Sequence, residues 1–132
     1  MPKQAPILTK FEPAYIYKAT VLEVHDGDTF TCDIDCGFNM VFRNRQIRMF
    51  GINAPELKMP DRKTNNPLGI AAAKYLRDMI AGKEVLLATF KDKTEKYGRL
   101  LAAVYIKSDS KTILNVNDEM VKLGHAVVYM TS

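Results

Sequence analysis

The sequence predicts one mainly β domain of the α+β class, built as a five-stranded barrel with two helices. Three observations support this prediction. The chain has 132 residues, of which 47% are hydrophobic and 26% charged, as in a single globular domain. Several segments alternate apolar and polar residues with the period of a β-strand. Two further segments carry apolar residues at helical spacing between a capping residue and a glycine.

The N-terminal residues 1–13 are expected to form a flexible arm, and residues 14–132 to form the domain. Pro2, Pro6 and Pro13 lie in this arm. Proline lacks the backbone N–H that helices and sheets use, so regular structure is not expected there.

Strand signals recur five times along the chain. The clearest is the segment from Thr29 to Cys36, in which four apolar residues alternate with polar ones. Gly51 is expected to mark a bulge or a point of close approach within the third strand. The predicted strands are Tyr15–Val24, Thr29–Cys36, Met40–Ile52, Glu84–Phe90 and Arg99–Lys107. The segments 25–28 and 91–98 are expected to be turns, and 53–66 a long loop.

Two helices are predicted from their end signals. The first is expected to begin at Pro67, with Asn66 as its N-cap, and to stop at Gly82. Asn115 is expected to cap a second helix that ends at Gly124. The residues expected on the inner faces are Leu68, Ala72, Tyr75, Leu76, Met79 and Ile80 in the first helix and Val116, Met120 and Leu123 in the second.

The order of these elements is three strands, a helix, two strands and a helix. Because short turns join the first three strands, we expect them to form an antiparallel meander. A five-stranded barrel with a helix inserted between the third and fourth strands matches the plan of the OB-fold.

Charge and cysteine content indicate the kind of partner and the redox state of the compartment. The 19 basic and 15 acidic side chains give a formal net charge of +4, which favours a polyanionic partner without proving one. Cys32 and Cys36 lie in one predicted strand, roughly 13 Å apart. A disulfide needs Cα atoms within about 7 Å, so two free thiols are expected, as in a reducing compartment.

The sequence shows no apolar run of signal-peptide or membrane-span length. We therefore expect a cytoplasmic protein that does not enter a membrane, with export by another route left open.

Three short motifs carry side chains suited to phosphate chemistry. The first, DGDT at 26–29, presents two carboxylates around a turn, and carboxylates bind hard cations. The second, RMFGINAPE at 48–56, places an arginine and a glutamate near the end of a strand. The third, KYGR at 96–99, is a basic and aromatic turn suited to a nucleotide. Taken singly, each motif is better explained as an ordinary capped or charged turn.

Together, in this order and at these separations, the three motifs resemble those of the staphylococcal nuclease (thermonuclease) family. The resemblance extends over residues 21–128. It implies an OB-type barrel, in agreement with the strand and helix pattern. It also implies a divalent-metal-dependent nuclease that hydrolyses DNA and RNA, with single strands preferred.

The resemblance assigns roles to individual residues. The implied catalytic residues are Arg48, Glu56 and Arg99, the implied metal ligands are Asp28, Asn53 and the backbone carbonyl of Ala54 with Asp26 in support, and the implied substrate contacts are Lys96 and Tyr97. The implied cofactor is Ca²⁺ or another divalent cation. Two guanidiniums match the oxygens of a phosphate, and Glu56 is expected to activate or orient the attacking water. Asn117 also matches a family position, which we interpret as structural.

Asn53 departs from the family pattern, which usually has a second aspartate ligand at this position. Since Ca²⁺ affinity depends on the charge of the ligands, weaker binding is expected. Three interpretations remain open: a site that works at higher metal concentration, a site that uses another ion or recruits a carboxylate such as Asp26, and a binding module for nucleic acid or protein that has lost catalysis. We expect retained activity, because Arg48, Glu56 and Arg99 are all present.

The C-terminus, the loop 57–66 and the two histidines give less specific indications of function. The family archetype continues into a further C-terminal helix, whereas this sequence ends at Ser132, so a less covered barrel flank and a monomer or weak homo-oligomer are expected. The basic loop 57–66 either lines the substrate groove or is simply solvated. His25 and His125 are expected to be structural.

Overall fold

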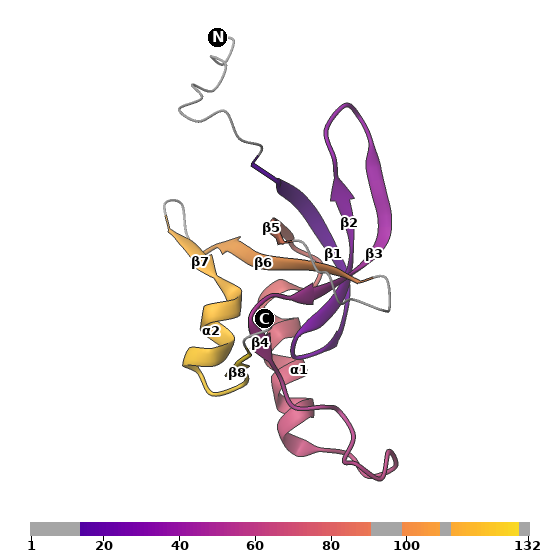
Figure 1. The fold of residues 1–132 in the computed structure, drawn as a ribbon, viewed down its shortest axis with the longest axis vertical. Coiled ribbons are helices and arrows are strands. Elements are labelled where there is room, and N and C mark those ends of the chain that lie inside the picture. Colours follow the sequence, from indigo (N-terminus) through magenta and orange to yellow (C-terminus); the bar gives the residue numbers. More distant parts are fainter. Residues whose placement is uncertain (1–13, 91–98, 109–111, 130–132) are drawn as a thin grey trace.

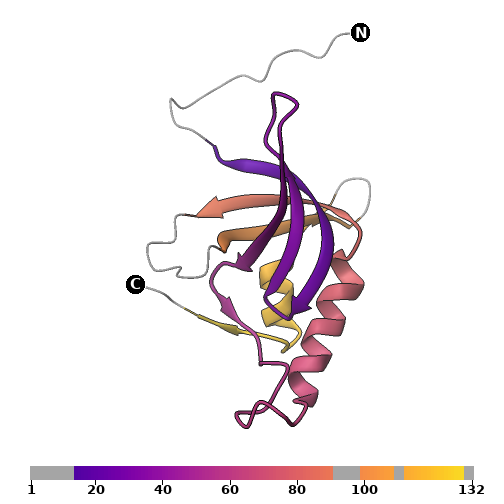
Figure 2. The same ribbon diagram turned by 90° about the vertical axis from the view of Figure 1, so that its right-hand side faces the viewer.

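The computed structural model describes residues 14–90, 99–108 and 112–129. The barrel strands are β1 (Ile16–Asp26), β2 (Thr29–Asp35), β3 (Val41–Met49), β5 (Glu84–Phe90) and β6 (Leu100–Lys107). They follow the order β3-β2-β1-β5-β6 with antiparallel neighbours, and a parallel pairing of β3 with β6 closes the ring (Figures 1 and 2). The predicted five-stranded OB-type barrel is therefore confirmed.

Three short strands extend this barrel and were not predicted. They are β4 (Ile52–Asn53), β7 (Ile113–Asn115) and β8 (Val127–Val128). Strand β7 pairs with β6, and β4 pairs with β8 in a separate two-stranded sheet. The prediction of one strand over Met40–Ile52 is wrong in this respect, because β3 ends at Met49 and Gly51 turns the chain with a φ of 77°. Gly51 thus lies in the turn between β3 and β4, whereas a bulge or a point of close approach within one strand was expected.

The two predicted helices are confirmed. Helix α1 (Pro67–Ile80) begins after Asn66, whose side chain accepts a hydrogen bond from the N–H of Leu68, and Gly82 has the expected positive φ. Helix α2 (Val116–Lys122) begins after Asn115, whose side chain accepts from the N–H of Asp118. Helix α1 lies against β1, and α2 lies against β6.

The inner faces of the helices differ from the prediction at two positions. Leu68 is 70% exposed and Leu123 is 46% exposed. In α1 the face toward the barrel includes Gly69, because the main chain of Glu56 approaches the helix there and turns Leu68 outward. In α2 the buried residues are Val116, Asn117 and Met120, and Leu123 lies just after the last helical residue, Lys122.

The core fills the barrel interior and the space under the helices. In β2 the predicted alternation holds, since Phe30, Cys32 and Ile34 are all buried. Both cysteines are free, as expected. Burial, with a smaller effect of the Asp33 charge, raises the pKa of Cys32 to about 12, so this thiol stays protonated. The largest fully buried side chains are Phe30, Ile47, Met49, Leu76, Ile80, Leu87 and Met120.

Two predicted segments fall outside the described residues: the N-terminal arm at 1–13 and the charged turn at 91–98. Among the helices in the described ranges, none is long and apolar enough to cross a membrane.

Candidate active site

The turn that joins β1 to β2 carries the two aspartates. The Asp26 carboxylate accepts a hydrogen bond of 3.0 Å from the N–H of Asp28 and so closes the turn on itself. Between them, Gly27 lies where a Cβ atom would come within 2.6 Å of the Ala54 side chain and 2.8 Å of that of Ala72. A glycine here therefore lets the turn sit tightly between the segment after β4 and helix α1.

Asp28 is a buried carboxylate, only 7% exposed, and its oxygens are held from several sides. Oδ2 accepts a 2.8 Å hydrogen bond from the N–H of Ala54, and Oδ1 accepts one of 3.1 Å from the Thr29 hydroxyl. The Arg48 guanidinium lies 3.6 Å from Oδ2. Because a buried polar group is costly without partners, these contacts satisfy both oxygens and fix the position of the carboxylate.

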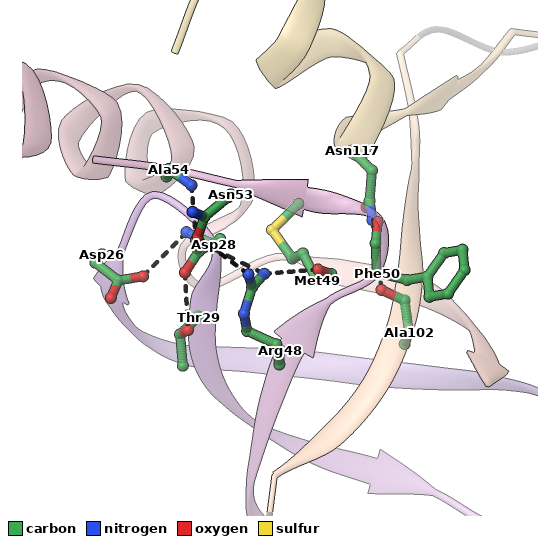
Figure 3. A network of polar contacts seen from close by, with 10 residues as sticks. All are labelled: Asp26, Asp28, Thr29, Arg48, Met49, Phe50, Asn53, Ala54, Ala102 and Asn117. Atoms are coloured by element: carbon green, nitrogen blue, oxygen red, sulfur yellow. Dashed lines mark hydrogen bonds and ion pairs between the residues drawn. The ribbon is translucent and has the colours of Figure 1, made fainter. Parts of the chain in front are cut away.

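Arg48 reaches this carboxylate from near the end of β3, as Figure 3 shows. Its Nη1 donates to the backbone carbonyl of Met49 at 2.8 Å, and its Nη2 donates to the side-chain oxygen of Asn53 at 3.3 Å. The structure thus brings Asp28, Arg48 and Asn53 together, and two side-chain oxygens converge on one guanidinium.

Asp26 and Glu56 lie beside this group and line one pocket of about 750 Å³. Burial is the largest cause that raises the pKa of Asp26 to about 6, followed by the neighbouring Asp28 carboxylate, with a smaller contribution from Glu56. The N–H of Asp28 acts in the opposite direction. The remaining pocket lining is Leu57, Lys58, Met59, Pro60, Arg62 and Asn66. One solvent-accessible pocket is therefore lined by two acidic side chains and by the basic side chains of Lys58 and Arg62.

Helix α1 fixes the main chain of Glu56. A Cβ atom at Gly69 would overlap the carbonyl oxygen of Glu56, so the helix and the loop touch backbone to backbone. Asn66 also donates its N–H to the carbonyl of Leu57 at 2.8 Å. Sequence reasoning missed the roles of Gly69 and Thr29, although a glycine inside a predicted helix was a usable signal.

For the other predicted site residues the structure gives the position of Arg99 in the fold and one contact of Ala54. Arg99 directly precedes β6, whose first residue Leu100 pairs with Ile47, so the parallel strands bring Arg99 beside the Arg48 segment. The contact seen for Ala54 is made by its N–H, and a ligand role for its carbonyl stays a prediction. Lys96 and Tyr97 lie outside the described residues.

Asn117 is structural, as expected. Its side-chain oxygen accepts the N–H of Val104 at 2.9 Å, and its amide nitrogen donates to the carbonyl of Phe50 at 2.8 Å. His25 and His125 also have structural contacts: the first hydrogen-bonds Thr31 at 2.6 Å, and the second stacks on an aromatic ring of α1.

The donor chemistry around Asp28 is compatible with a hard divalent cation. In the described ranges no group of three or more His, Cys, Asp or Glu residues could hold a metal ion by itself. The oxygens of Asp28 and Asn53 nevertheless converge on a positive group, the guanidinium of Arg48, with Asp26 next to them. Calcium and magnesium prefer such oxygen ligands, and the low number of charges favours weak binding.

The sequence profile of a family described as staphylococcal nuclease homologue matches residues 46–132. The chain belongs to this family. The matched segment contains Arg48, Asn53, Glu56 and Arg99. The family resemblance that the three motifs suggested is therefore confirmed.

Several relatives in this family carry nuclease names. A thermonuclease of Staphylococcus hyicus is 28% identical over 80% of this chain and 56% of its own length. A probable endonuclease of Paracoccidioides brasiliensis is 29% identical over 96% of this chain and 43% of its own length. An uncharacterized endonuclease of Haemophilus influenzae is 32% identical over 83% of this chain and 51% of its own length. The chain thus spans about half the length of these relatives, whose names suggest nuclease activity.

Proposed function

We propose that this chain is a metal-dependent nuclease that hydrolyses the phosphodiester bonds of DNA and RNA. The observation that carries the proposal is the convergence of Asp28, Asn53 and Arg48 at one end of the barrel, with Glu56 beside them. A cation-binding carboxylate, a phosphate-binding guanidinium and a base are the groups that hydrolysis of a phosphodiester requires.

Arg48 and Arg99 stabilise the charge that grows on the phosphate oxygens in this proposal. A guanidinium carries five N–H donors in a planar fork, so Arg48 can bind phosphate oxygens while it still donates to Met49 and Asn53. These fixed partners orient the fork before the substrate arrives. Arg99 contributes the second fork from the parallel neighbour strand.

Glu56 accepts a proton from the attacking water, or orients that water, in this proposal. Its side chain is exposed and lines a pocket to which water has access. Its main chain is held against α1, which limits the positions that the carboxylate can take. Both properties suit a group that must meet a water molecule at a defined place.

Asp28, Asn53 and the carbonyl of Ala54, with Asp26 in support, would hold Ca²⁺ or another divalent cation. When bound there, the cation supplies Lewis-acid stabilisation of the phosphate oxygens and lowers the repulsion between carboxylates and substrate. Asn53 supplies an amide oxygen without a negative charge, so the proposed affinity is lower than for a site with two aspartates.

A second candidate function is a nucleic-acid-binding or protein-binding module that has weakened or lost catalysis. The engagement of Arg48 by Asp28 and Asn53 favours it, because the guanidinium occupies the two side-chain oxygens that a cation would need. Such a module binds single strands with an affinity that falls with salt and does not depend on Glu56.

The proposal is tested by measuring the cleavage rate and the dissociation constant of DNA for one isosteric variant. Glu56→Gln is expected to lower the rate of single-stranded DNA cleavage by on the order of 10²- to 10⁴-fold, while the dissociation constant of the DNA stays the same. Glu84→Gln removes the same charge from an exposed position on β5 and serves as the matched control. Binding by the wild type without any divalent-dependent cleavage would establish the binding module instead.

A further inference from the structure

The rings of Phe50 and Phe90 stack on one another at the surface of the barrel. Their centroids are 3.8 Å apart and the ring planes differ by 9°. Phe50 is 36% exposed and Phe90 is 43% exposed, so each ring also meets solvent. Exposed phenyl rings held parallel offer a flat apolar surface on which a further planar group can stack.

Phe90 lies two strands away from Arg48 in the same row of the sheet, and Phe50 lies just beyond the end of β3. Phe90 pairs with Leu101 of β6, and Leu101 pairs with Arg48 of β3, so the three residues form one row across neighbouring strands. Paired residues point to the same side of a sheet. Since neighbouring strands are spaced by about 4.8 Å, the Cα atoms of Phe90 and Arg48 are roughly 10 Å apart. Phe50 follows Arg48 by two positions in the chain, and its ring points away from Asp28 in Figure 3.

The backbone of Phe50 is held on both sides although its ring is exposed. Its N–H donates to the carbonyl of Ala102 at 2.8 Å, and its carbonyl accepts the amide of Asn117 at 2.8 Å. These bonds fix the main chain that carries the ring, and stacking on Phe90 holds the ring itself. A rigid ring loses little conformational entropy when a ligand stacks on it.

A different exposed ring shows what is particular about this pair. Phe38 is 97% exposed and lies in the turn between β2 and β3, at the opposite end of β3 from Arg48. Exposure alone therefore does not mark a site in this molecule. The Phe50–Phe90 pair combines exposure and mutual stacking, and Phe90 lies in the row of Arg48.

We propose that Phe50 and Phe90 form a stacking platform for a nucleobase of the single strand whose phosphate Arg48 binds. The inference rests on the proposed nuclease function and adds the place where a neighbouring nucleotide is held. Every base has a π-face, so a platform of this kind accepts all bases and needs an unpaired strand. It excludes duplex DNA, in which the faces of the bases are already stacked.

The test compares the binding of a strand that carries bases with the binding of a strand that lacks them, at constant salt. A chelator is present so that no strand is cut. Fluorescence anisotropy measures the dissociation constants of an oligothymidylate and of the same backbone with abasic positions. The wild-type chain is expected to bind the oligothymidylate roughly fivefold or more tightly than the abasic strand, which is the contribution of one stacked base. Phe50→Leu, Phe90→Leu and the double variant are expected to lose this preference and to keep the abasic affinity.

Two further variants sharpen the result. Phe38→Leu removes an exposed ring of the hairpin tip and is expected to leave the preference unchanged. Phe90→Trp keeps an aromatic surface and is expected to retain it. Unchanged preference in the double variant, or an equal loss of affinity for both strands, would overturn the platform. Cleavage and binding by the wild type are measured first, and their absence would overturn the proposed function and the platform with it.

Discussion

At the scale of single residues, the site depends on how a buried carboxylate is stabilised. Asp28 is satisfied by one backbone N–H, one hydroxyl and one guanidinium. Of these partners, only Arg48 was a candidate from the sequence, because the N–H of Ala54 is supplied by a segment 26 positions away. Motif reasoning therefore selects the charged residues of a site, whereas a backbone donor such as the N–H of Ala54 is brought in by a tertiary contact.

Asn53 is the residue at which the family pattern changes, and its substitution gives the first prediction. Asn53→Asp adds a negative charge beside Asp28, so the apparent dissociation constant for Ca²⁺ is expected to fall by about tenfold. The measurement is a Ca²⁺ titration by isothermal calorimetry. Asn39→Asp, which adds the same charge at the hairpin tip, is the control. An unchanged constant in Asn53→Asp would place this residue outside the metal site.

Asp26 gives a prediction about pH. Its folded pKa of about 6 lies above the ordinary aspartate pKa of 3.8, so the folded chain binds more protons than the unfolded chain between these values. Stability therefore falls as the pH rises from about 4 to 6, and the loss is complete above the folded pKa. Asp26→Asn keeps an oxygen for the N–H of Asp28 and is expected to flatten this slope.

The size of this effect is limited by solvent, because Asp26 is only partly buried. After allowance for screening, Asp26→Asn is expected to raise the free energy of unfolding by about 1 kcal/mol at pH 7.5 in the presence of a chelator. Urea titrations at pH 4.5 and 7.5 measure the difference. If the free energy of unfolding changes equally between these two pH values in the wild type and the variant, Asp26 does not titrate as described.

At the scale of elements, most of the secondary structure followed from the sequence. Alternation in β2 and the cap and stop residues of α1 and α2 are local signals, and each element formed where they predicted it. Strand β4 was missed because two residues cannot show a period, and it exists through its pairing with β8. The outward direction of Leu68 was missed because the approach of the Glu56 main chain sets the rotation of α1.

Helix α1 gives a prediction in which two effects oppose one another. Helix propensity alone would make Gly69→Ala stabilising by up to about 1 kcal/mol. The overlap with the Glu56 carbonyl is expected to win, and to lower the free energy of unfolding by about 1–3 kcal/mol. Because the loop that carries Glu56 must shift, kcat is expected to fall more than the affinity for DNA.

A nearby substitution provides the comparison for Gly69→Ala. Ile70 is 44% exposed in the same turn of α1, so Ile70→Ala changes helix propensity without adding a Cβ atom against the Glu56 carbonyl. It is expected to leave kcat unchanged. Chemical denaturation and single-turnover cleavage are measured for both variants, and a more stable, fully active Gly69→Ala would contradict the proposed close contact.

At the scale of the whole molecule, the site is assembled by non-local pairing. The parallel contact of β3 with β6 closes the barrel and brings Arg99 beside the Arg48 segment, although the two arginines are distant in the chain. The order of strands and helices was sufficient to predict this topology. The contacts between Asp28, Arg48 and Asn53 were not predictable from it, because they depend on side-chain directions at one end of the barrel.

Asn117 joins α2 to the rest of the barrel, and its loss should affect the whole fold. Asn117→Ala leaves the N–H of Val104 and the carbonyl of Phe50 without their partner, so we expect the free energy of unfolding to fall by about 2–4 kcal/mol. Asn115→Ala removes a single N-cap bond and is expected to cost about 1 kcal/mol. Urea denaturation of both variants checks the difference, and equal costs would contradict the bridging role of Asn117.

The central claim is that this barrel cuts phosphodiester bonds with a bound cation and the guanidinium of Arg48. The most direct measurement is the initial rate of single-stranded DNA cleavage during a Ca²⁺ titration of chelated protein, for the wild type and for Arg48→Lys. We expect no cleavage without the cation, a saturable rise with Ca²⁺, and a rate in Arg48→Lys lower by on the order of 10²- to 10³-fold. Cleavage that persists in the chelator, or a DNA-bound wild-type chain that cuts nothing at any Ca²⁺ concentration, would contradict the claim.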